Sequence, residues 1–291
     1  MPMRAMTLKR IIVMGAALAL CLFAASIWNL TQAKDPWHRV YTGDGTIIEL
    51  NSTTLRFGPA NLLRAHFRTV FSNAESIPGD RGQKYKTRLE TIDFRLTDRK
   101  YRFVEISLLD SGGKPIQTKT VDASEDWRVL KPGGITERLF TAACSFTPLG
   151  SWKVIAYRFA EGDPKETKST PDLDRLIGAS VYLNIDSAAV GNRVCNSPSF
   201  QDKDPAEDES LRHLGIVWKS IGIRREDART IDVRCGGEGW QPARSLLVKD
   251  NKKEEMLMLW DGVFLVLKRS NGGAFRVAPG DGRATLKRHE P

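Results

Sequence analysis

The sequence predicts a mainly β, α+β protein built from two small antiparallel β units. The first unit is expected to be a meander sheet with one C-terminal helix, and the second a barrel-like sheet. Short runs that alternate apolar and polar residues recur along the chain between clusters of turn residues. Hydrophobic residues make up 41% and charged residues 27% of the chain, which is ordinary for a globular protein.

The first unit spans residues 36–144. Its clearest strand is Leu63–Phe71, where apolar and polar residues alternate as in a strand with one wet face. Further strands are expected at 37–41, 46–50, 85–94, 101–109 and 114–121. Turn residues separate them, most clearly at Asp110–Gly113. Helical spacing of apolar residues after Pro132-Gly133 predicts the closing helix over 134–143.

A second unit is expected over residues 151–269, after a short hinge at 145–150. Strands are expected at 151–154, 177–185, 190–195, 230–235, 245–249, 256–260 and 263–268. Residues 160–174 are expected to form a polar loop, and residues 202–220 either a short helix or a loop with one turn. Residues 270–291 lack periodicity and are expected to be a disordered basic tail.

The first 33 residues are typical of an export signal. Three basic residues precede an apolar run over 11–28, and Thr31-Gln32-Ala33 supplies small residues at the −3 and −1 positions. Three alternatives remain open: a cleaved signal peptide, an uncleaved membrane anchor through residues 11–28, and a lipid-modified Cys21. A cleaved signal or an anchor would place the body in the periplasm or at the outer cell surface, because the basic residues precede the run.

The formal charge of +9 is concentrated at the two ends of the chain. Residues 1–33 hold three basic and no acidic residues, and residues 268–291 hold six basic and two acidic ones. The body between them is nearly neutral. This distribution does not indicate a polyanion groove, so no nucleic-acid partner is expected.

No catalytic residue, cofactor or metal site is expected. The histidines at 38, 66, 213 and 289 lack metal-ligand spacing, and no serine lies in a Gly-x-Ser-x-Gly motif. His66 falls on the polar phase of a strand, which favours a solvent-facing side chain. Gly236–Gly239 follows a strand but leads to Trp240 rather than to a helix, which argues against phosphate binding.

The cysteines are more informative than the histidines. Cys195 and Cys235 fall at the ends of two predicted strands, and in an oxidising compartment they are the best candidates for a disulfide. Cys144 then remains as an unpaired thiol, which its place after helically spaced apolar residues predicts to be buried.

Residues 36–144 resemble the surface-adhesin protein E domain family in the order and spacing of several short pieces. The matching pieces are Trp37…Val40, Ile47–Leu55, Ala65–Val70, Lys84-Tyr85-Lys86, Ile92-Asp93, Arg99–Arg102, Trp127…Gly133 and Ala142-Ala143-Cys144. The resemblance implies a small exported antiparallel-sheet domain of a Gram-negative bacterium. The founding member of the family is an adhesin for host surface and matrix proteins, whereas most members have no assigned activity.

The chain departs from this family at one position. The family usually has a cysteine after Ile-Asp that pairs with the cysteine near the end of the domain, and this chain has Phe94 there. The resemblance therefore implies that Cys144 is the remaining half of a lost bridge.

These observations favour an exported, non-enzymatic binding module that contacts a protein or an envelope or matrix macromolecule. Trp127, Trp152, Trp218, Trp240 and Trp260 are candidate interface anchors, although core packing is favoured for most of them, particularly Trp152 and Trp260. The alternative is a lipocalin-like carrier of a small apolar ligand in the 177–268 unit, which would need an open apolar pocket. A hydrolase would need His66 or His213 beside an acidic residue and a serine.

Overall fold

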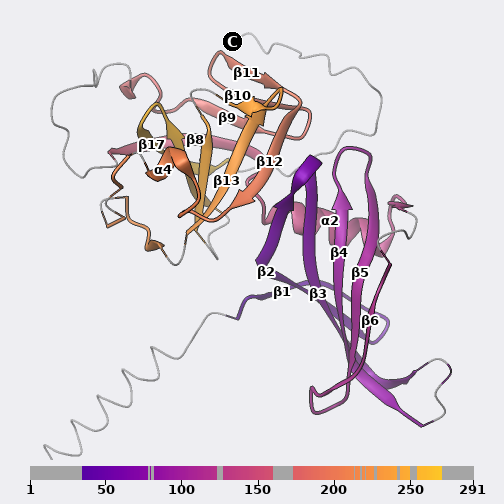
Figure 1. Cartoon of the computed structure of the whole chain (residues 1–291). Helices are drawn as coiled ribbons and strands as arrows, with labels where there is room; N and C mark the ends of the chain where they lie inside the picture. Colours follow the sequence, from indigo (N-terminus) through magenta and orange to yellow (C-terminus); the bar gives the residue numbers. More distant parts are fainter. Residues whose placement is uncertain are drawn as a thin grey trace, which may run out of the picture. The chain divides into compact units, whose positions relative to one another are not determined.

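A computed structural model describes residues 35–270, apart from residues 78, 80–81, 123–126, 160–172, 213, 217, 220, 226–227, 241–242 and 250–253. From Trp37 onward the chain forms one compact unit (Figure 1). The predicted export signal, the basic tail from 271 onward, most of the 160–174 loop, His213 and His289 lie outside the described residues. Within the described part, no helix has the length and apolarity needed to cross a membrane.

The first β unit is a seven-stranded antiparallel meander, sheet A, as predicted (Figure 1). Its strands are β1 (Trp37–Gly43), β2 (Thr46–Gly58), β3 (Leu62–Ser76), β4 (Lys84–Arg95), β5 (Lys100–Leu109), β6 (Pro115–Thr120) and β7 (Arg128–Val129). Each strand pairs with the next in sequence, except that β7 pairs with β5. The 3₁₀ turn η1 (Pro59–Asn61) joins β2 to β3.

Helix α2 (Ile135–Ser145) covers one face of sheet A. Glu137 in its first turn accepts a hydrogen bond from the Gly133 N–H at 2.7 Å. This bond satisfies a backbone N–H group just before the helix begins. The helix buries Leu139, Phe140 and Ala143. The Phe140 ring lies 5.5 Å from the Phe94 ring of β4, so the two elements share an aromatic core.

The second unit, sheet B, is a ten-stranded antiparallel sheet in a nearly closed, barrel-like arrangement. Its strands are β8 (Gly150–Phe159), β9 (Ser180–Leu183), β10 (Ser187–Val190), β11 (Arg193–Asn196), β12 (Pro198–Lys203), β13 (Ala228–Cys235), β14 (Glu238–Gly239), β15 (Ser245–Lys249), β16 (Glu255–Trp260) and β17 (Val263–Arg269). The order along the sheet is β11-β10-β9-β8-β17-β16-β15-β13-β12, and β14 pairs with β13.

The predicted strand boundaries of this unit were wrong in three places. The expected strand at 190–195 is a hairpin of β10 and β11, because Gly191 turns the chain with φ +57°. The expected strand at 177–185 begins only at Ser180, after a turn. The 202–220 segment follows an unpredicted strand, β12, and its helix α4 covers only Glu209–Arg212.

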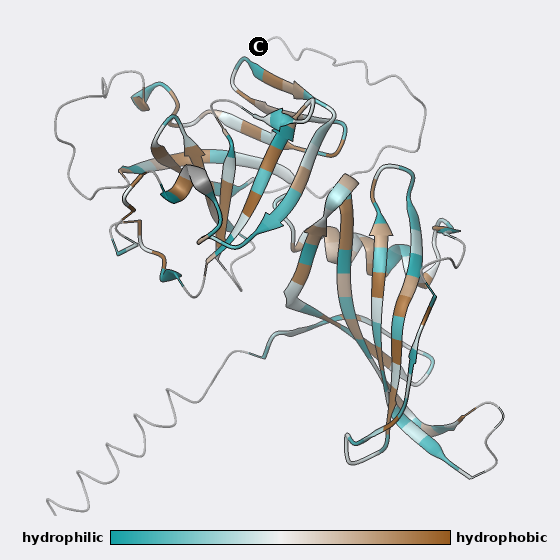
Figure 2. Ribbon diagram, in the orientation of Figure 1, coloured by the Kyte–Doolittle hydropathy of each residue, from teal (hydrophilic) through white to brown (hydrophobic). Residues whose placement is uncertain are grey.

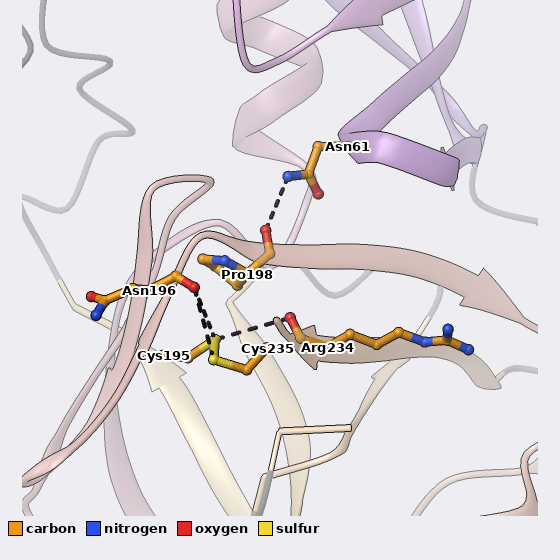
Figure 3. Close-up of a disulfide and its surroundings, with 6 residues drawn as sticks. All are labelled: Asn61, Cys195, Asn196, Pro198, Arg234 and Cys235. Carbon is orange, nitrogen blue, oxygen red and sulfur yellow. Dashed lines mark hydrogen bonds between the residues drawn. A yellow bond between two sulfur atoms is a disulfide. The ribbon is translucent and has the colours of Figure 1, made fainter. Parts of the chain in front are cut away.

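The Cys195–Cys235 disulfide ties the corner at which sheet B closes (Figure 3). Strands β11 and β12 lie at opposite ends of the strand order, yet a single residue, Ser197, separates them in sequence. Ser197 makes the corner with φ +53°. Cys235 pairs with Pro198 in the β12–β13 register, so the bridge holds β11 against β13 where hydrogen-bonded pairing stops.

The outer edge of β12 is covered by residues of sheet A. The Asn61 side chain donates to the Pro198 carbonyl and accepts from the Phe200 N–H, both at 3.0 Å (Figure 3 shows the first bond). Further along, Asp202 accepts a hydrogen bond from the Phe57 N–H. Residues of β2 and η1 therefore contact alternate positions of β12 and shield an edge that would otherwise be open to other strands.

A buried ion pair completes this junction. Arg229 Nε of β13 lies 3.1 Å from Asp202 Oδ1, and their side chains are 9% and 10% exposed. Arg229 also donates to the Leu55 carbonyl of β2. Because both charges are largely removed from water, each depends on the other for compensation.

The apolar core is continuous between the two sheets. One cluster joins buried residues of sheet A and α2 to the inward-facing residues of sheet B. A second cluster lies on the other face of β15–β17, where Leu211, Ile221 and Ile223 cover Leu247, Leu257 and Phe264. These strands are buried on both faces and consequently appear almost uniformly apolar in Figure 2, whereas apolar and polar residues alternate along sheet A.

We expect that replacing both Cys195 and Cys235 by Ser lowers the free energy of unfolding by about 4 kcal/mol, because the bridge spans 40 residues. Urea unfolding followed by tryptophan fluorescence measures the loss. A reducing agent should destabilise the wild type and a Cys144→Ala control, and leave the double variant unchanged. A double variant as stable as the wild type would contradict a closing role for the bridge.

Replacing Asp202 by Ala should cost about 3–5 kcal/mol, since it leaves the Arg229 guanidinium buried without its carboxylate. Thermal and urea unfolding measure the change. Glu207→Gln is the matched control, because Glu207 is an exposed carboxylate beside the same junction. Equal effects of the two substitutions would show that the junction does not depend on the ion pair.

Candidate functional site

The face of sheet A opposite α2 carries a group of charged side chains. Along β3 the buried residues alternate with Arg64, His66 and Arg68, which therefore share the opposite face. The strand registers align neighbouring side chains with these three. We call this surface the arginine face; it comprises Trp37, Arg39, Glu49, Arg56, Arg64, His66, Arg68, Thr91, Asp93, Arg95, Asp98, Lys100, Arg102, Glu105 and Trp127.

A buried carboxylate organises the centre of the arginine face. Asp93 is fully buried and accepts hydrogen bonds from Arg64 Nε at 2.7 Å and Nη2 at 3.0 Å. Arg102 Nη2 lies 3.3 Å from the same carboxylate. The Asp93 hydrogen bond also raises the pKa of Arg64. The Arg64 and Arg102 side chains remain 44% and 21% exposed, so one hidden negative charge holds two cations at the surface.

Trp127 lies beside two of these cations. The guanidinium carbons of Arg95 and Arg102 lie 4.6 Å and 4.8 Å from its ring centroid, within cation–π range. Arg95 also donates to both carboxylate oxygens of Asp98, at 2.7 Å and 2.6 Å. These contacts fix the planes of both guanidinium groups.

A second tryptophan holds another arginine on β3. The Arg68 guanidinium carbon lies 4.6 Å from the Trp37 ring centroid, and Arg68 Nη2 lies 2.7 Å from Glu49 Oε2. The Arg68 side chain is 31% exposed. The same combination of an aromatic ring and a carboxylate therefore orients an arginine at both of these places.

His66 lies between the two arginines of β3 and is half-buried. Burial and the positive charges of Arg64 and Arg56 lower its pKa, and Glu105 opposes this effect. A hydrogen bond with the Thr54 backbone also opposes it. The Nδ1 atom is buried and has no hydrogen-bond partner within the described residues. His66 is consequently neutral at pH 7 and can accept a hydrogen bond there.

A separate polar groove of about 660 Å³ lies where sheet A meets β12 and β13. The lining includes Arg56, Lys203 and Arg229 together with Asp202, Asp204 and Glu207. An adjoining hollow of about 450 Å³ includes Arg225. The groove thus carries both signs of charge, and the Asp202–Arg229 pair that joins the sheets is part of its lining.

Large apolar side chains lie in the interior of sheet B. Trp152, Phe200, Trp240 and Met258 are all at most 4% exposed and belong to the continuous core. Trp152 donates from Nε1 to the Pro148 carbonyl at 2.7 Å, which satisfies its polar atom inside the protein. This packing gives an apolar ligand cavity in the 177–268 unit no support.

The described side chains that could act as a nucleophile or a base lie on different elements, with His38 in β1, His66 in β3 and Cys144 in α2. Cys144 is a free, fully buried thiol in α2, and burial raises its pKa far above the ordinary range. His38 Nε2 lies 2.9 Å from Ser52 Oγ, and the ring packs 4.6 Å from Phe146. His66 lies on the arginine face. Among the described residues, no group of three His, Cys, Asp or Glu side chains is placed to hold a metal ion.

The structure assigns different positions to the candidate tryptophans. Trp152 and Trp240 are buried in the core, at 2% and 4% exposed, and Trp260 packs partly buried against it. Trp218 packs partly buried against the second cluster. Trp127 alone among these candidates lies on the arginine face. Core packing, the favoured interpretation for Trp152, is confirmed.

Sequence reasoning missed the arginines of this face. The alternation along Leu63–Phe71 already placed Arg64, His66 and Arg68 on one wet face, and only the histidine was considered. Their partners Asp93 and Trp127 come from β4 and from the segment before β7, and only the sheet brings them together.

Known proteins give no guide to this face. The sequence matches no protein-family model, no curated protein and no solved structure. A function therefore has to be inferred from the residues and their geometry.

We expect His66 to make stability depend on pH. Because its pKa is lower in the folded than in the unfolded state, the unfolded state takes up the proton first as the pH falls below about 6.5. The free energy of unfolding should therefore decrease more steeply between pH 7.5 and pH 5 in the wild type than in a His66→Gln variant. Urea unfolding across this range measures both slopes, and equal slopes would contradict the expectation.

Proposed function

We propose that this chain is an exported, non-enzymatic envelope protein that binds a macromolecular partner through the arginine face. The single observation that carries the proposal is the array of partly exposed arginines stacked on Trp37 and Trp127. Arginine and tryptophan are the residues that most often dominate binding energy at interfaces.

Four arginines of this face, Arg64, Arg68, Arg95 and Arg102, are preorganised. Asp93, Asp98 and Glu49 hold their guanidinium groups by ion pairs, and the two tryptophans pack against the last three of them. A partner that contacts these side chains consequently loses less conformational entropy than it would against unrestrained arginines. The face is therefore suited to binding rather than only to keeping the protein soluble.

Export is part of this proposal. The disulfide between Cys195 and Cys235 is compatible with an oxidising compartment such as the periplasm or the cell exterior. The first 33 residues supply the expected export signal, and the resemblance of residues 36–144 to the surface-adhesin protein E domain family points to the same compartment. Membership of that family and adhesion as such belong to the proposal.

The alternative of a lipocalin-like carrier is weaker. A carrier needs an apolar cavity, usually of about 300 Å³ or more, with a few polar groups. The inward-facing residues of sheet B belong to a continuous apolar core, and the groove at the junction has a polar, charged lining.

The proposal predicts that partner capture depends on the arginine face. The full-length protein, tagged at its C-terminus, is used to retain partners from envelope extract and from host matrix proteins. We expect an Arg95→Ala/Trp127→Ala variant to lose what the wild type retains. An Arg193→Ala/Tyr182→Ala variant is the matched control, because it removes the same kinds of side chain from exposed positions of sheet B.

The control variant should retain the same partners as the wild type. Circular dichroism and melting temperatures check that both variants fold. Loss of capture by the control variant but not by the arginine-face variant would contradict the proposal, as would a partner that both variants retain in full.

A further inference from the structure

We propose that the occupant of the arginine face is a carboxylated polysaccharide. This inference rests on the proposed function and adds the chemical class of the partner.

Positive charge predominates on the arginine face. Basic side chains outnumber acidic ones on it, and its central acid, Asp93, is fully buried beneath Arg64 and Arg102. Asp93 therefore lies beneath its two cations, whereas Asp98 and Glu105 are exposed. Because the basic side chains of the face outnumber the acidic ones, an anion complements its net charge.

The arginines of this face show which anion they fit. Arg64 binds the Asp93 carboxylate through Nε and Nη2, and Arg95 binds the Asp98 carboxylate through the same pair of atoms. Both pairs are bidentate, the geometry in which a planar guanidinium matches a planar carboxylate. Arg64 binds Asp93 through Nε and Nη2, and its third nitrogen atom, Nη1, takes no part in this ion pair.

The spacing favours a polymer over a single small anion. Alternate residues of a strand are about 6.6 Å apart, so Arg64 and Arg68 of β3 are separated by about 13 Å. One carboxylate cannot span this distance, whereas a chain with a carboxylate on successive units contacts both arginines at once.

The aromatic rings of this face favour a polysaccharide as its partner. Trp37 and Trp127 supply flat aromatic surfaces near the cations. The C–H groups on the face of a sugar ring pack favourably on such rings, because the aromatic face carries partial negative charge.

The test measures binding of the full-length protein to polygalacturonate, dextran sulfate, neutral dextran and a single-stranded oligonucleotide by isothermal titration calorimetry at two salt concentrations. We expect binding to polygalacturonate that weakens with salt, and none to neutral dextran. An Arg39→Gln/Arg95→Gln variant should bind at least tenfold more weakly. A Lys153→Gln/Arg193→Gln variant removes the same net charge from exposed positions of sheet B and should bind like the wild type.

A charge-conserving variant keeps the test independent of folding and of net charge. Arg39→Lys/Arg95→Lys retains both positive charges but lacks the planar fork, and it should lose most of the affinity that the glutamine variant loses. Wild-type binding by this lysine variant would overturn the inference, because charge alone would then suffice. Equal weakening by the sheet B variant, or tighter binding to dextran sulfate or the oligonucleotide, would overturn it as well.

Failure of the inference is distinguishable from failure of the proposed function. If no polysaccharide binds but the arginine-face variant still loses a captured envelope or matrix partner, the carboxylated polysaccharide is wrong and the binding function stands. If neither polysaccharide binding nor face-dependent capture occurs, both are wrong.

Discussion

The corner between β11 and β12 is the constraint on which the arrangement of this protein depends. These strands are consecutive in sequence but lie at opposite ends of the order in sheet B, so the sheet has to curve until they meet. The Cys195–Cys235 disulfide ties β11 to β13, the strand that pairs with β12, and Asn61 of sheet A binds the backbone of β12 directly after the corner. Closure of one sheet and attachment of the other therefore occur at the same strand.

This arrangement explains why one face of sheet A is available. The end of β2 and η1 contact β12, while α2 covers the apolar face of the sheet. Each side chain on the remaining face belongs to the opposite phase of the same strands, and in β3 this phase is Arg64, His66 and Arg68. The apolar core and the arginine face therefore both follow from one alternating pattern of residues.

The sequence predicted the features that depend on local pattern. The meander, its helix and the buried phase of Leu63–Phe71 follow from periodicity, and the Cys195–Cys235 bridge follows from the expected compartment and strand ends. Strand β12 was missed because Pro198 and the charged residues after it do not resemble a strand until Asn61 and Phe57 supply its edge contacts. The arginine face was missed because its pairs join residues from different strands, and register is not visible in one sequence.

A surface of this protein can be positively charged although residues 34–267 together are nearly neutral. Asp93 holds Arg64 and Arg102, and in sheet B the 2% exposed Asp232 side chain lies 3.0 Å from Lys203 and 2.8 Å from Arg234. In both clusters one carboxylate is removed from the surface while two cations stay on it. Counting charges along the sequence treats a hidden carboxylate and an exposed arginine as equal, so a nearly neutral body appeared to exclude an anionic partner. The field that a partner meets is set instead by the charges that remain exposed to solvent, and at the arginine face those charges are mostly positive.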